Sequence, residues 1–211
     1  MHRRYLRRLT IVGAGLLATV LLSGCGGNND RDANRAIGVG QPTTPATPSP
    51  TATFNSADVS FATQMIPHHR QAIEMAQMAE QRASNAKVKQ LAVRIKQAQD
   101  PEIATMSGWL RQWGQLVPSP STGHGGHGGQ GGQDGPGMMS DQEMSDIESA
   151  SGTDFDRMFL QMMIRHHQGA VEMADNEQQQ GQNPEAKQLA EKIASDQTAE
   201  INEMQDLLTK I

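Results

Sequence analysis

One segment of this chain occurs twice, 98 residues apart. Residues 58–110 align with residues 156–208 without a gap, and 22 of the 53 aligned positions are identical. The strongest match pairs 65–76 with 163–174, and both stretches carry two adjacent histidines. Because this period is long and encloses a loop, it indicates a duplicated folding unit and excludes a solenoid of short repeats.

Each unit is expected to form two helices. The run Asn183-Pro184-Glu185 is typical of a helix start, with an N-cap, a proline at the first helical position and an acid in the first turn. Gly181 would end the preceding helix. The pairs Asn55 with Asp58 and Thr153 with Asp156 have the spacing of a capping box. Asp58 and Asp156 are therefore interpreted as helix-capping residues in preference to metal ligands.

These signals predict four long helices, at about 56–82, 86–115, 154–180 and 184–210, with a short helix near 140–150. A hairpin of two amphipathic helices leaves an apolar face that needs a partner. We therefore predict an all-α fold, a four-helix bundle made of two duplicated αα-hairpins.

The segments outside the repeats predict export and tethering. Residues 1–24 have four arginines followed by a short apolar stretch and are interpreted as a lipoprotein signal peptide, with Cys25 as the acylated first residue of the mature chain. Residues 25–54 are rich in Pro and Thr and are predicted to be a disordered tether. This places the protein on the extracytoplasmic face of the cell membrane, held by a lipid anchor.

The predicted domain then runs over 55–211, as a hairpin at 55–117, a loop at 118–139 and a second hairpin at 140–211. The loop is rich in Gly and holds His124 and His127, which are either an accessory metal-capturing tract or a result of the biased composition. We expect this loop to be a solvated linker that makes few contacts.

Composition excludes several classes of function. The net charge of −5 argues against a nucleic-acid binder, which needs a basic face. A single Cys leaves no intrachain disulfide and no thiolate zinc cage. The chain has no serine nucleophile elbow, no phosphate-binding glycine loop and no His-Glu-x-x-His motif, and the Glu-x-x-His motif of di-iron bundles is also missing.

Polar groups interrupt the apolar stripes of the predicted helices. Gln99 and Glu102 lie on the buried face of one helix, and the repeat places Gln197 and Glu200 in the same way. Burying such groups costs free energy unless they find partners. Hairpin geometry, accurate to about one helical turn, predicts that the first histidine of each pair faces the glutamine and that the preceding methionine faces the glutamate.

The sequence therefore predicts one polar layer in the bundle. Neutral imidazole and thioether ligands suit copper, and the carboxylates would suit harder metals. The candidate metal ligands are His68, His69, His166, His167, Met65, Met163, Glu102 and Glu200. The alternatives are a hydrogen-bonded network of His, Glu and Gln without metal, and methionines that only fill the core.

Both copies resemble the family known as domain of unknown function 305. Its pattern, Met-Ile-x-His-His followed by Ala and Met-Ala and then Gln-x-x-Glu-Ile-x-x-Met, is present over 65–106 and again over 163–204, with Arg165 in place of the usual proline. The resemblance implies a ferritin-like helical bundle that is secreted or lipid-anchored, and an association with copper binding and copper tolerance for some members.

Three functions of different classes follow from the sequence. The first is extracytoplasmic sequestration or handling of a metal ion, copper above others. The second is a non-catalytic envelope domain whose histidines form a buried polar network. The third is a metal-dependent enzyme such as an oxidase, for which the sequence names no substrate, so a non-enzymatic role is favoured.

Overall fold

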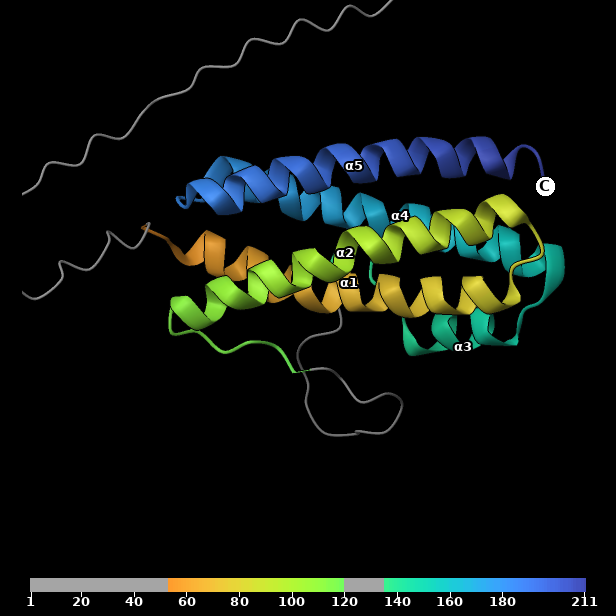
Figure 1. The fold of residues 1–211 in the computed structure, drawn as a ribbon, viewed down its shortest axis with the longest axis horizontal. Helices are drawn as coiled ribbons and strands as arrows, with labels where there is room; N and C mark the ends of the chain where they lie inside the picture. The colour runs from red at the N-terminus through yellow and green to blue at the C-terminus, as the bar shows by residue number, and fades with distance from the viewer. Residues whose placement is uncertain (1–52, 120–134) are drawn as a thin grey trace, which may run out of the picture. The chain divides into compact units, whose positions relative to one another are not determined.

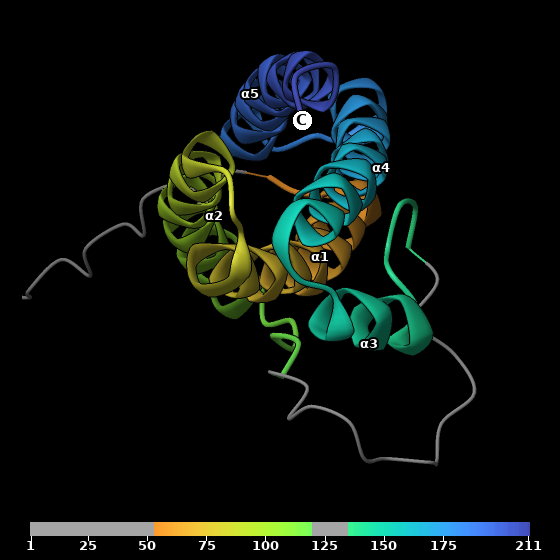
Figure 2. The ribbon, with the colours of Figure 1, turned by 90° about the vertical axis from the view of Figure 1, so that its right-hand side faces the viewer.

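Five α-helices form the part of the chain that this computed structural model describes, residues 53–119 and 135–211. They are α1 (Ser56–Arg82), α2 (Ala86–Gln112), α3 (Asp141–Ser149), α4 (Gly152–Gln180) and α5 (Pro184–Leu208). All lie in one unit, 48–211. The helices α1 and α2 form one hairpin and α4 and α5 the other (Figures 1 and 2), so the predicted all-α bundle is confirmed.

The helix ends follow the capping signals with one exception. Asn55 and Asp58 form the expected capping box, and the Asn183 side chain accepts hydrogen bonds from the first turn of α5. Thr153 is not an N-cap, because α4 begins earlier, after Ser151, whose side chain makes no capping hydrogen bond. The helix α2 ends at Gln112, before the predicted 115, and the chain turns at Gly114, where φ is +70°.

The two hairpins meet mainly through α1 and α4, whereas α2 and α5 contact each other much less. The short helix α3 lies outside the bundle, beside α1 and α4 (Figure 2), and buries Met144 and Ile147. Buried apolar side chains form two clusters, one around Ile95 and Phe159 and the other around Phe61 and Ile193. The four histidines belong to neither cluster and lie along α1 and α4 between them.

Each hairpin supplies an aspartate that holds the turn of the other hairpin. Asp58 on α1 accepts a hydrogen bond of 2.8 Å from the backbone N–H of Asn183, in the α4–α5 turn. Asp156 on α4 accepts bonds of 3.0 and 2.9 Å from the backbone N–H groups of Ser84 and Asn85, in the α1–α2 turn. Asp58 is therefore a capping residue with a second role, and Asp156 acts across the bundle instead of at its own helix.

The end of the glycine-rich loop packs against the bundle, contrary to the expectation of a solvated linker. Gln71 exchanges two hydrogen bonds with the backbone of Met139, at 2.8 and 2.7 Å. At Gly169 the backbone of Pro136 passes so close that a Cβ atom would lie 1.8 Å from its carbonyl oxygen. Glycine at this position in α4 thus lets residues 135–139 cross the helix.

Several predictions concern residues outside the described ranges. The signal peptide at 1–24, Cys25, nearly all of the tether and both loop histidines, His124 and His127, lie there. Among the described helices, none is long and apolar enough to cross a membrane.

Candidate metal centre

Four buried histidines face one another where α1 meets α4. His68 and His69 come from α1, His166 and His167 come from α4, and none is more than 1% exposed. The rings of His68 and His166 are in contact, with centroids 3.7 Å apart and planes inclined by 36°. The duplication explains this meeting, because the same motif on two antiparallel helices places equivalent rings across a pseudo-twofold axis.

The second histidine of each pair is bound to a glutamate of its own hairpin. His69 Nε2 lies 2.8 Å from Glu102 Oε2, and His167 Nε2 lies 2.7 Å from Glu200 Oε2. The sequence-based register paired the first histidine with glutamine and the methionine with glutamate, and the observed pairs differ from it by about one helical turn, which is the accuracy that hairpin geometry allows. The polar layer that it predicted nevertheless forms, with histidine and glutamate as the direct partners.

These contacts determine which ring nitrogens are free. A carboxylate and a carbonyl oxygen only accept hydrogen bonds, so Nε2 of His69 and of His167 donates to glutamate, and Nε2 of His68 donates to the Pro136 carbonyl at 3.1 Å. The Nδ1 atoms of all three are buried without a partner, and so are both ring nitrogens of His166. A neutral ring that donates through one nitrogen presents a lone pair on the other.

Burial keeps the central rings uncharged near neutral pH. It lowers the pKa of His68 to about 3, with a further lowering by the neighbouring His69. Burial also lowers the pKa of His69 against the opposing effect of Glu102, and it holds the pKa of His166 well below the usual value. Uncharged imidazole is the form that binds metal ions, so no proton has to be displaced from these rings at pH 7.

The two His–Glu pairs have different surroundings. Lys192 Nζ on α5 lies 3.0 Å from Glu102 Oε1 and 2.7 Å from Asp196 Oδ2. Burial raises the pKa of Glu102, but the hydrogen bonds and charges of His69 and Lys192 outweigh it, and the net pKa is below the usual value. Glu200 is more accessible than Glu102, with 18% of its side chain exposed against 9%.

The two candidate methionines and the two glutamines take different places. Met65 packs with Phe61 and Met106 in one apolar cluster, and Met163 packs with Phe159 in the other. The two thioethers thus lie on opposite sides of the histidines. Gln99 and Gln197 are buried, and the side-chain oxygen of each has no hydrogen-bond partner.

The histidines and glutamates are close neighbours but do not converge on one point. Within residues 53–119 and 135–211, no three His, Cys, Asp or Glu side chains are grouped so that they could hold a metal ion as they stand. Ring rotations would have to bring the free Nδ1 atoms together. The arrangement offers buried imidazole lone pairs, which are suitable ligands for a soft or borderline cation.

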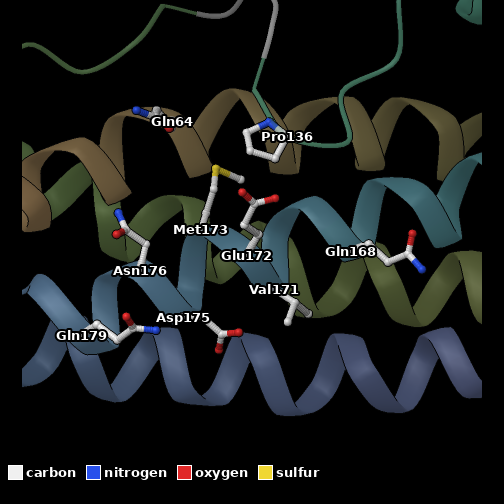
Figure 3. Close-up of a pocket in the computed structure, with 9 residues that line it drawn as sticks. All are labelled: Gln64, Pro136, Gln168, Val171, Glu172, Met173, Asp175, Asn176 and Gln179. Carbon is white, nitrogen blue, oxygen red and sulfur yellow. The ribbon is translucent and has the colours of Figure 1, made fainter.

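A surface pocket lies on the other side of α4 and contains none of the eight candidate ligands. It has a volume of about 550 Å³ and is lined by Glu172, Asp175 and Met173, with Pro136 at its edge (Figure 3).

A second buried polar cluster lies at the α4–α5 turn. Glu177 is 1% exposed and sits beside Asp58, and burial raises its pKa to about 8, with the charge of Asp58 adding to the effect. Gly181 makes room for it, because a Cβ there would lie 2.2 Å from Glu177 Oε1. The first repeat has Ala79 and Ala83 at the equivalent positions, so this buried acid belongs to one repeat only.

Sequence reasoning missed both Lys192 and Glu177. Lys192 occupies an exposed helix position that carries no pattern of its own. Glu177 could have been found by comparing the repeats, where an Ala-to-Glu change accompanies an Ala-to-Gly change four residues later.

Comparison with known proteins identifies similar chains over most of the bundle. Residues 58–208 match the family described as "Domain of unknown function (DUF305)". The structure is similar to a DUF305 protein of Streptomyces coelicolor, at 32% identity and a TM-score of 0.64, covering 74% of this chain and 93% of that one. No curated protein matches the chain.

Two further solved structures match over nearly their whole length. A DUF305 fragment from Deinococcus radiodurans is 29% identical with a TM-score of 0.63, covering 74% of this chain and 98% of the fragment. CopM in its Cu(II)-bound form is 37% identical with a TM-score of 0.60, covering 72% of this chain and 96% of CopM. CopM structures with Cu(I) and with Ag match as well.

Proposed function

Because this chain belongs to the DUF305 family and is similar to CopM, which has been solved with copper bound, we propose that it binds and sequesters copper ions outside the cytoplasm. The observation that carries the proposal is the set of buried, partnerless imidazole nitrogens where α1 meets α4. Leaving these buried ring nitrogens without partners costs free energy, which a bound cation would recover.

The residues present suit copper as cargo. His68, His69, His166 and His167 supply imidazole nitrogens, and Met65 and Met163 supply thioethers from the two adjoining clusters, which favours Cu(I). Glu102 and Glu200 hold the Nε2–H of their histidines and so orient the opposite nitrogen, as carboxylates commonly do behind metal-binding histidines. In this role the glutamates position ligands and can become ligands themselves.

The proposal includes the place where the protein acts. A signal peptide over 1–24 with acylation at Cys25 would leave the bundle tethered to the outer side of the cytoplasmic membrane, on a spacer of about 30 residues. Copper bound there would be kept from reaching the cytoplasm.

A second candidate function is a purely structural one, and a specific observation favours it. Both His–Glu pairs and the bond from His68 to Pro136 tie α1 to α2, α4 to α5 and the loop end to the bundle. In this alternative the histidines specify how the hairpins meet, and the protein would act as an envelope interaction domain.

Substitution by glutamine separates the two. Gln at positions 69 and 167 keeps an N–H donor for the glutamates but removes the imidazole lone pair. In the His69→Gln/His167→Gln protein we expect copper affinity, measured by competition with a chelator, to fall at least about tenfold, or about 1.4 kcal/mol. The apo protein should lose only about 1–2 kcal/mol of stability per altered hydrogen bond.

The matched control is His124→Gln/His127→Gln, which removes the two loop histidines and leaves the bundle intact. Its copper affinity should equal that of the wild type. If the loop variant loses binding and the bundle variant keeps it, the bundle site is refuted and the loop is the binder. If neither loses binding, His69 and His167 are not ligands and their structural role gains support.

A further inference from the structure

The duplicated glutamates are approached by cations in different ways. Lys192 on α5 and Arg94 on α2 are equivalent residues of the two repeats, and both reach across to the facing helix of the other hairpin. Arg94 binds both carboxylate oxygens of Glu203, at 2.6 and 2.7 Å. Lys192 instead binds Glu102 Oε1, while the other oxygen of Glu102 holds His69.

Sequence differences between the repeats account for this asymmetry. The equivalent of Glu203 in the first repeat is Thr105, which has no charge to offer the lysine. Arg94 therefore binds Glu203, which lies one helical turn after Glu200. The His167–Glu200 pair is left without a neighbouring cation. Lys192 has no such carboxylate there and binds Glu102 together with Asp196, whose equivalent in the first repeat is Ala98. Among the described residues, no Lys or Arg forms an ion pair with Glu200.

The ammonium group of Lys192 opposes a second cation at Glu102. It neutralises part of the charge that would attract a metal ion, and it binds the carboxylate oxygen of Glu102 that does not hold His69. Repulsion across the His69–Glu102 pair weakens binding of an ion at the free Nδ1 of His69, although the lysine side chain is 55% accessible, so water and salt screen the repulsion. The same repulsion is missing at His167–Glu200.

We propose that Lys192 makes the two duplicated half-sites unequal, so that copper binds first at His167–Glu200 and only more weakly at His69–Glu102. This inference rests on the proposed copper-binding function and adds to it an order of filling. Lys192 is on this view a positioning residue that tunes affinity through Glu102 and does not touch the ion.

The test isolates each half-site and then removes the charge. In the His167→Gln background, Lys192→Met should raise the affinity for Cu(II), added alone and measured by chelator competition, by about threefold to fivefold. In the His69→Gln background the same change should have no effect. Lys192→Arg keeps the charge and should restore wild-type affinity in both backgrounds.

Two further measurements exclude a structural explanation. Arg94→Met, the matched control, removes the equivalent cation that does not touch a histidine-bound glutamate, and it should leave the Cu(II) affinity of both backgrounds unchanged. The gain from Lys192→Met should shrink as salt rises from low to about 0.5 M, since an electrostatic effect is screened and a packing effect is not.

The outcomes distinguish the inference from the function it rests on. If wild-type protein binds no Cu(II), the proposed function fails, and the inference fails with it. If the wild type binds but Lys192→Met acts equally in both backgrounds, or in neither, only the inference is refuted. Loss of all binding in each single histidine variant would also refute it, because the four histidines would then form one shared site.

Discussion

Replacing Glu177 and Gly181 by alanine should remove a loss of stability that we expect of the wild-type protein between pH 5 and pH 9. The folded state raises the pKa of Glu177 from 4.5 to about 8, mainly through burial. The folded protein therefore holds this proton more tightly than the unfolded chain does. The stability that results is fully present below about pH 4.5 and is lost as the pH rises through 8.

The size of the effect follows from the two pKa values. A difference between 4.5 and about 8, at about 1.36 kcal/mol per pH unit, gives an upper bound of about 5 kcal/mol at pH 9. Entry of water next to the ionised carboxylate relieves part of this, so we expect about 3–5 kcal/mol. Asp58, the neighbouring acid, has a lowered pKa and stays ionised throughout this range.

The assay is urea unfolding at pH 5, 7 and 9 for wild type and the double variant. The variant copies Ala79 and Ala83 of the first repeat, so the protein itself shows that this packing is allowed. Glu172→Ala, which removes an exposed glutamate of the same helix, should keep the wild-type pH dependence. The reasoning is refuted if wild type and double variant lose the same stability between pH 5 and pH 9, within about 0.5 kcal/mol.

Two other predictions test the loop end and the anchor. Gly169→Ala places a Cβ 1.8 Å from the Pro136 carbonyl oxygen and should cost about 1–3 kcal/mol of unfolding free energy, whereas Gly108→Ala, with nothing within 4 Å, should stabilise α2 by about 0.5–1 kcal/mol; equal melting temperatures for the two would contradict the close approach. Cys25→Ala should move the protein from the membrane to the soluble fraction of fractionated cells, because acylation would be its only anchor after signal cleavage; a variant that still sediments with membranes would count against the lipoprotein assignment.

The helices were predictable because their signals are local. Asn55 with Asp58, and Asn183 with Pro184, mark helix starts through chemistry that operates within one turn, and the structure has both. The start of α4 was missed because the Ser151 side chain makes no capping hydrogen bond. The carboxylate of Asp156 accepts hydrogen bonds from the α1–α2 turn and not from its own helix. A residue that serves a distant segment looks in the sequence like a local cap.

The histidine layer was predictable only in outline. Buried polar residues recurring in both repeats indicated that a layer forms, but the choice between His68 and His69 as partner of Glu102 depends on where the hairpin turn lies to within one helical turn. The role of Lys192 could not be predicted from the sequence, for a different reason. Its contact with Glu102 joins two helices far apart in the sequence, and it depends on the neutral side chain of Thr105 nearby.

The exchange of aspartates between the two turns has a consequence for the origin of the chain. Asp58 completes a turn that belongs to the second hairpin, and Asp156 completes the turn of the first. A single hairpin would thus carry both a turn that lacks an acceptor and an acceptor that lacks a turn, and a second copy of itself would satisfy both at once. The fold has the symmetry of an isologous dimer whose two subunits have been joined into one polypeptide. After such a fusion each half was free to diverge, and Glu177 and Lys192 are places where the halves are no longer the same.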